Sequence, residues 1–140
     1  MAINETDAGR SYPPTAPYEV SAAKIAEFAT AIGDAHPAYQ GEAAVAPPTF
    51  VAVISSAAWG SMFDDQELGL ALRRIVHGDQ RFDHREPLRA GDVVTAALRI
   101  DRVRARGGSE MITASAQITD ADGAERGTAT ATFVHTRAAS

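Results

Sequence analysis

The segment that most constrains the fold lies near the middle of the chain. Between residues 50 and 62 the only polar side chains are three serines, so a helix here would be apolar around most of its circumference. Pro47 and Pro48 stand just before this segment, and proline is favourable in the first turn of a helix because the N–H that it lacks would have no partner there. The sequence therefore predicts a helix from about 48 to 63 that is buried on several sides.

From residue 75 onward the hydrophobic period changes to two, which is typical of β-strands. Turn-forming residues separate the later segments, for example Gly107-Gly108 and Asp122-Gly123. These connections are too short for a crossover, so the last three strands are expected to form an antiparallel meander. The predicted strands are 75–84, 92–104, 109–119 and 126–136.

A second helix is predicted earlier in the chain. Ser21 is a good N-cap, and apolar residues follow it at helical spacing as far as Ile32. Gly33 is a natural stop and Pro37 forbids continuation, so residues 34–39 are expected in a turn or loop.

The remaining segments complete the predicted architecture. Residues 1–17 are expected to form an extended arm, because prolines interrupt 11–17. For residues 68–74 a short helix and a loop both remain open. The 140 residues fit one domain, 1–140, and together the elements predict an α+β protein whose curved antiparallel sheet wraps around one long apolar helix.

Composition excludes several classes of function. The chain has no cysteine, which excludes a disulfide scaffold, a thiolate nucleophile and any cysteine-ligated metal. Its net charge of −5 argues against a nucleic-acid partner, since binding one needs a basic face. The first residues are polar and acidic, unlike a secretory signal, and no window approaches the ~20 apolar residues that cross a bilayer. We expect a cytoplasmic protein without a membrane span.

The loop after the first helix carries the most informative motif. Residues 32–39 are Ile-Gly-Asp-Ala-His-Pro-Ala-Tyr. This segment resembles the active-site loop of the MaoC-like (R)-specific hydratases and dehydratases, usually Gly-Asp-x-Asn-Pro-x-His. Two further segments are similar to the same family: 46–50, Ala-Pro-Pro-Thr-Phe, and 76–92, which ends in Pro-Leu-Arg-Ala-Gly-Asp. The resemblance implies a hotdog fold and paired domains, with the acyl site at the subunit boundary.

The resemblance also implies a reaction, the reversible loss of water from a (3R)-hydroxyacyl thioester. In the family, the Asp and His of the loop act as general acid and base. Asp34 is in register with that Asp, and His36 takes the place of the Asn. Tyr39 stands where the family keeps its histidine, and a phenol is a poor general base near neutral pH. The substrate is carried on acyl carrier protein or coenzyme A, and no cofactor is implied.

A second departure from the family lies at the start of the long helix. Catalytic relatives commonly have Ala-His-Gly there, and the glycine N–H polarises the thioester carbonyl. This chain has Ala46-Pro47-Pro48, so position 48 has no N–H to offer, and Thr49 is the next donor.

Together, the two departures resemble the non-catalytic HadA/HadC-type subunits of heterodimeric (3R)-hydroxyacyl-ACP dehydratases in fatty-acid synthesis. In those enzymes one hotdog subunit keeps Asp and His, and its partner holds the acyl tail. The resemblance implies that this chain lacks the catalytic histidine and works with a catalytic hotdog subunit. The residues expected to contact the acyl group are Tyr39, Pro48, Thr49, Phe50 and Trp59.

Two other functions remain open. A self-sufficient homodimeric hotdog hydratase or thioesterase would use Asp34 with His36 as its catalytic pair. An acyl-binding module of the same fold would catalyse no reaction.

Charged residues near the first long strand permit further interpretations. A group that superficially resembles a metal site consists of His77, Asp79, Asp83 and His84. On an alternating strand 77, 79 and 83 share a face that 84 opposes, which is a poor spacing for a compact site, so no metal is predicted. Two interpretations are open for Arg73, Arg74, Arg81 and Arg85. They lie on a solvated surface, or they contact phosphopantetheine or an acidic carrier protein.

Overall fold

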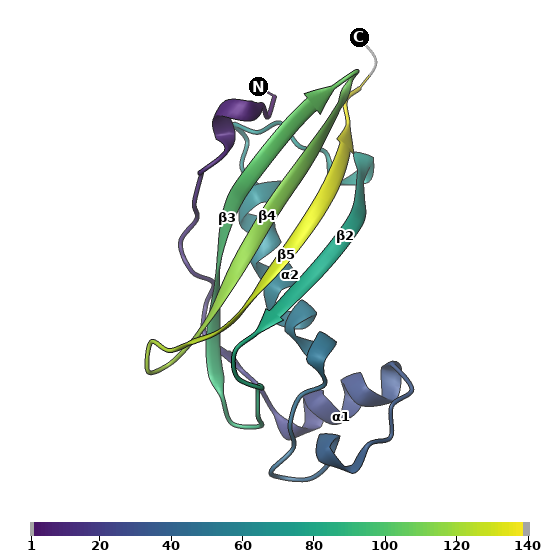
Figure 1. The fold of residues 1–140 in the computed structure, drawn as a ribbon, viewed down its shortest axis with the longest axis vertical. Helices are drawn as coiled ribbons and strands as arrows, with labels where there is room; N and C mark the ends of the chain where they lie inside the picture. Colours follow the sequence, from purple (N-terminus) through teal and green to yellow (C-terminus); the bar gives the residue numbers. More distant parts are fainter. Residues whose placement is uncertain (1, 139–140) are drawn as a thin grey trace.

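The computed structural model describes residues 2–138, in which an antiparallel sheet curls around one long helix (Figure 1). The main elements are β1 (Tyr18–Glu19), α1 (Ala22–Ala31), α2 (Val51–Phe63), β2 (Ile75–His84), β3 (Val93–Arg106), β4 (Ser109–Asp120) and β5 (Glu125–Thr136). The strands hydrogen-bond in the order β1-β3-β4-β5-β2. Helix α2 lies against one face of the sheet, and α1 lies beyond one end of it (Figure 1). The predicted α+β hotdog architecture is confirmed.

Helix α2 is the centre of the hydrophobic core. The predicted helix is present, and its first turn is a 3-10 turn at Pro48–Phe50. Inward-facing side chains of the sheet, such as Leu98, Ile112 and Phe133, are buried with it. The buried side of the helix consists of Val51, Ile54, Ser55, Ala58 and Met62. Within residues 2–138, no helix has both the length and the apolar character required to span a bilayer.

Helix α1 begins and ends where its sequence signals predict. The Ser21 side chain accepts a hydrogen bond from the Lys24 N–H at 3.0 Å, which satisfies a donor of the first turn. After Ile32, Gly33 takes a φ of 73°, a left-handed conformation that glycine adopts without steric cost. This ending directs the loop that carries Asp34 away from the helix axis.

The strands β3, β4 and β5 form the predicted antiparallel meander. Strand β2 then adds to the far side of β5, with a bulge between His77 and Asp79. The bulge corrects one prediction, that 77, 79 and 83 share a face. His77 pairs with the buried Phe133, whereas Asp79 pairs with Thr132. The extra residue, Gly78, therefore places His77 and His84 on the concave side, and Asp79 and Asp83 on the convex side.

The N-terminal arm runs along the outer edge of β3. It is not extended throughout, since a 3-10 turn forms at Glu5–Asp7 and Asn4 caps it. Beyond this turn the arm donates backbone hydrogen bonds to β3, from Gly9 to Ile100, from Tyr12 to Leu98 and from Thr15 to Ala96. The open question about residues 68–74 is answered by a 3-10 turn at Leu72–Arg74.

The arm leaves the sheet with one free edge. It occupies backbone groups of β3 that would otherwise be exposed, and β1 covers the start of the same strand. In the described part of the chain, no segment pairs with the outer edge of β2. An unpaired strand edge is a template for another chain. The free edge of β2 is therefore available for pairing with a further strand.

A polar cluster fastens the arm to the end of α2. The Tyr12 hydroxyl donates to Asp65 Oδ2 at 2.7 Å, and Arg10 donates to the same oxygen at 2.9 Å and to Glu67 at 2.7 Å. The hydrogen bond from Tyr12 lowers the pKa of Asp65, with the backbone N–H of Glu67 and Arg10 acting in the same direction. Burial, followed by the bond to Asp65, raises the pKa of Tyr12.

This cluster predicts an acid-sensitive stability. Because the folded-state pKa of Asp65 is below its ordinary value, its contribution is present near neutral pH and is lost as the pH falls through the folded-state pKa. Replacing Asp65→Asn should flatten the fall in unfolding free energy below about pH 5. Tyr12→Phe should cost about 1 kcal/mol at pH 7. Urea unfolding followed by circular dichroism over a pH series measures both effects.

The matched control is Asp64→Asn, because Asp64 is exposed and its side chain forms no hydrogen bond or ion pair within residues 2–138. This variant should keep the pH profile of the unmodified protein. Equal profiles for the two asparagine variants would contradict the role given to Asp65.

Candidate functional site

A cavity of about 380 Å³ lies where β2 ends and α2 begins, and it opens to solvent. One wall comes from the segment before α2, from the first turn of α2 and from Tyr39. The other wall comes from the end of β2 and the connection to β3. The lining residues are Tyr39, Val45, Ala46, Pro47, Pro48, Val51, His84, Arg85, Glu86, Pro87 and Leu88. Most of the surface is apolar, and the polar side chains are Tyr39, His84, Arg85 and Glu86.

The two walls are joined directly by backbone hydrogen bonds. The Ala46 N–H donates to Leu88 O at 2.8 Å, and the Ala90 N–H donates to Ala44 O at 2.9 Å. An isolated antiparallel bridge between Val45 and Arg89 lies between these two bonds. Segments about forty residues apart in the sequence therefore form one short ladder behind the cavity.

Tyr39 ends a short 3-10 turn, Pro37–Tyr39, and is half-buried at the cavity. The turn is attached to the opposite segment by a hydrogen bond from the Val45 N–H to Ala38 O at 2.8 Å. Near neutral pH a phenol can donate or accept a hydrogen bond, but it is a much weaker proton acceptor than an imidazole. The loop therefore contributes a polar group but no strong base at the position of Tyr39, while the imidazole of His84 and the carboxylate of Glu86 lie in the other wall.

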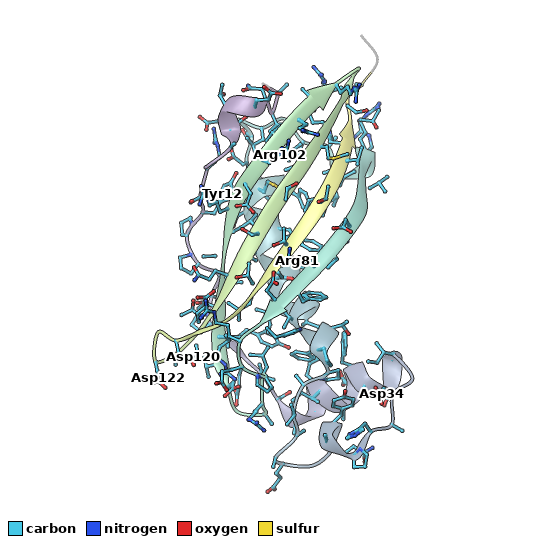
Figure 2. All side chains as sticks on the ribbon, in the orientation of Figure 1. Tyr12, Asp34, Arg81, Arg102, Asp120 and Asp122 are labelled. Atoms are coloured by element: carbon cyan, nitrogen blue, oxygen red, sulfur yellow. The ribbon has the colours of Figure 1, made fainter. Side chains whose placement is uncertain are left out.

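The structure does not bring Asp34 into this cavity. Asp34 is exposed, and its Oδ1 accepts a hydrogen bond from the His36 N–H at 3.1 Å. It lines a separate, open hollow of about 510 Å³ beside α1, together with Thr30 and Gln40. Figure 2 shows Asp34 in the lobe formed by α1, away from the sheet. Asp34 and Tyr39 thus face different spaces within this chain.

His36 has a local structural role. Its Nδ1 accepts a hydrogen bond from the Ala38 N–H at 3.1 Å, so the side chain caps the Pro37–Tyr39 turn. In a neutral ring that accepts through Nδ1, the proton resides on Nε2. The ring centre lies 5.6 Å from that of Tyr39, without a hydrogen bond between the two side chains.

The start of α2 contributes to the cavity only in part. Pro48 lines it and has no N–H. The Thr49 N–H has no hydrogen-bond acceptor among residues 2–138, although Thr49 is outside the cavity lining. Phe50 is fully buried and its ring lies 5.4 Å from that of Phe28, so it belongs to the core.

Trp59 is also separate from the cavity. Its ring packs edge-on against Phe133 at 5.0 Å and His77 at 5.1 Å, two turns further along α2. Of the seven residues predicted for catalysis or acyl contact, the structure places two, Tyr39 and Pro48, in the cavity.

Sequence reasoning missed most of the second wall. The sequence indicates Glu86, Pro87 and Leu88 only as part of a family-like segment, and it suggests other roles for His84 and Arg85. Nothing in the local pattern indicates that this segment faces Tyr39, because the contact depends on the bridge between Val45 and Arg89. Among the described residues, no group of three or more His, Asp and Glu side chains is arranged to hold a metal ion.

The four arginines considered for carrier binding have separate surroundings. Arg81 pairs with Asp83 at 3.0 Å on the convex face of the sheet, opposite Thr130 of β5. Arg85 lies at the cavity and 3.5 Å from Glu125. Arg74 donates to Arg137 O at 3.5 Å, and Arg73 is exposed. They do not form one patch around the cavity, since Arg85 alone of the four lines it.

The curled sheet around α2, with a mostly apolar cavity at the start of the helix, defines a hotdog-fold domain of the MaoC-like type. Residues 6–125 match the model of the family described as "FAS1-like, dehydratase domain region", and the chain belongs to that family.

Related proteins agree with this assignment. A UPF0336 protein of Cutibacterium acnes is 49% identical, covering 98% of this chain and 96% of the relative. A chain of the Mycobacterium tuberculosis HadBC (3R-hydroxyacyl-ACP dehydratase) complex superposes with a TM-score of 0.80 at 29% identity, over 91% of this chain and 96% of that one. A MaoC-like dehydratase superposes with a TM-score of 0.82 at 24% identity, over 94% of this chain and 43% of that one, and shows the shared fold.

The geometry at His36 predicts different effects for two substitutions. His36→Ala removes the acceptor for the Ala38 N–H and should destabilise the chain by about 1 kcal/mol. His36→Asn supplies another acceptor, since Asn is a strong N-cap residue, and should change stability by less than about 0.5 kcal/mol. Urea midpoints measure both. An equal loss in the two variants would contradict the capping role.

Proposed function

We propose that this chain is the acyl-tail-binding subunit of a (3R)-hydroxyacyl-thioester dehydratase. It would act in fatty-acid or related lipid or polyketide synthesis. A catalytic hotdog subunit supplies the Asp and His, and this chain supplies the apolar cavity beside Tyr39. The substrate arrives as a thioester of acyl carrier protein or coenzyme A. The observation that carries the proposal is a phenol, rather than an imidazole, at the cavity where the family's loop places its base.

The chemistry of dehydration supports the need for a partner. A base must take the C2 proton while an acid protonates the leaving C3 hydroxyl, so that the C2–H and C3–O bonds break and the double bond forms. Of the loop residues of this chain, Tyr39 is a poor base, His36 Nδ1 is occupied by a backbone N–H, and Asp34 faces another hollow; His84 and Glu86 line the cavity from the other wall, outside the family's loop. Pro48 also lacks the N–H that would polarise the thioester carbonyl.

The free edge of β2 supports a two-subunit assembly. The arm occupies the opposite edge of the sheet, along β3. Pairing through β2 would therefore extend the sheet into a partner. Two structural neighbours are complexes of different subunits, HadBC and ChsH1-ChsH2 of Mycobacterium tuberculosis. The second of these, at 17% identity, shares the fold alone.

Tail binding alone is a useful contribution to such an enzyme. Each methylene moved from water into an apolar cavity contributes about 0.8 kcal/mol, so a tail of six methylenes contributes about 5 kcal/mol before ordering costs. That free energy can hold a long substrate without any catalytic group in this subunit. A division of labour in which one subunit binds and the other reacts is therefore physically sufficient.

The proposal predicts activity that depends on a partner. This chain should be co-purified with a MaoC-like subunit whose loop keeps Gly-Asp-x-Asn-Pro-x-His, and dehydration of a (3R)-hydroxyacyl thioester should be followed by enoyl absorbance. We expect turnover by the pair and none by this chain alone. Asp34→Asn in this chain should change the rate by less than about twofold, because Asp34 faces a different hollow.

The matched control is the corresponding Asp→Asn change in the partner, which should abolish turnover. Turnover by this chain alone, abolished by Asp34→Asn, would instead establish a self-sufficient enzyme. Acyl groups bound in native mass spectra, with no turnover by any pairing, would establish a binding module.

A further inference from the structure

In the cavity wall formed by residues 85–88, Leu88 is bonded directly to the opposite wall, through the Ala46 N–H. Arg85, Glu86 and Pro87 are exposed, and Leu88 is the buried member of the segment. The exposed part of the segment needs a further anchor if the cavity is to keep its width. One residue of β5, Arg126, supplies that anchor through both its backbone and its side chain.

The backbone of Arg126 holds the beginning of the wall. Its carbonyl oxygen accepts hydrogen bonds from the Arg85 N–H at 3.1 Å and from the Glu86 N–H at 3.4 Å. Strand β5 also approaches the end of β2 very closely here. A Cβ built at Gly127 would lie 2.7 Å from Asp83 O, so glycine is required by this approach.

The side chain of Arg126 holds the end of the wall. Its Nη2 donates to Pro87 O and to Asp92 Oδ2, the latter at 2.9 Å, and its Nη1 lies 3.5 Å from Asp120 Oδ2. Asp92 Oδ2 in turn accepts the Arg89 N–H at 2.8 Å. The guanidinium is nearly buried, with 11% of the side chain exposed.

The guanidinium therefore joins three segments. It connects the cavity wall to the start of β3 and to the end of β4, where Figure 2 shows Asp120 beside the β4–β5 turn. A planar guanidinium with five donors can satisfy acceptors in several directions at once, whereas the compact ammonium of lysine cannot hold all three in this geometry.

We infer that Arg126 is a specificity-determining positioning residue of the acyl cavity. By fixing residues 85–88 against the segment of Tyr39, Pro48 and Val51, it sets how far an acyl tail can be enclosed. Arg126 itself is absent from the cavity lining and acts through Pro87 and the backbone of Arg85 and Glu86. This inference rests on the proposed tail-binding function. It adds a residue that controls which tail length is preferred.

The inference is tested by ligand selectivity in the full chain. The probe is cis-parinaric acid, a fatty acid that fluoresces in apolar surroundings, displaced either by dodecanoate or by hexanoate. In the unmodified protein dodecanoate should displace the probe at the lower concentration. Arg126→Gln should reduce this preference by about tenfold, because long tails lose contacts at the displaced wall that short tails never make.

Control variants separate positioning from general stability. Arg126→Lys should reduce the preference by less, because one or two of the acceptors remain satisfied. The matched control Arg99→Gln removes an exposed arginine of β3, 4.0 Å from Asp101, and should leave the preference unchanged. If Arg126→Gln does not fold, the comparison of Arg126→Lys with the unmodified protein carries the test.

The two claims fail in different ways. No binding of the probe to the unmodified chain would overturn the acyl cavity and, with it, the role of Arg126. Selective binding by the unmodified chain with the same selectivity in the Arg126 variants would overturn the inference alone. An equal loss of affinity for long and short competitors would likewise overturn it, because a purely structural residue gives that result.

Discussion

The burial of α2 is the constraint on which the rest of the structure depends. The helix is apolar around most of its circumference, and one sheet can cover only part of a cylinder. The concave face covers Ile54, Ala58 and Met62, while Val53 remains half-buried and Ala57 exposed. With β3 covered by the arm and β2 left free, the sheet is incomplete at the β2 edge, whereas the exposed Ala57 lies beside the arm at the opposite edge.

The same helix determines the chemistry available to the chain. Its first turn begins with Pro48, which shapes the cavity and removes a backbone donor in the same step. The loop opposite supplies Tyr39, held by the turn that His36 caps. These features give a mostly apolar enclosure to which the loop contributes a phenol in place of the family's histidine. Anchoring of the other wall by Arg126 gives that enclosure a defined size.

Local signals predicted most of the fold but little of the site. Ser21, Gly33 and the alternation of the strands are short-range features, and the elements they predict are present with ends displaced by at most three residues. The bulge at Gly78 reversed the face of His77, because a glycine in a strand does not reveal whether an extra residue will be accommodated. The wall at Leu88 was missed because its position depends on pairing with a segment far away in the sequence.

The central claim is that the tail lies in this chain while the reaction occurs at the partner. The most direct measurement uses a (3R)-hydroxyacyl thioester with a photoreactive group at the end of its tail, irradiated with the assembled pair and mapped by peptide mass spectrometry. We predict labels on residues 45–51 or 84–88 of this chain. Labels confined to the partner, or to the hollow beside Asp34, would contradict the account.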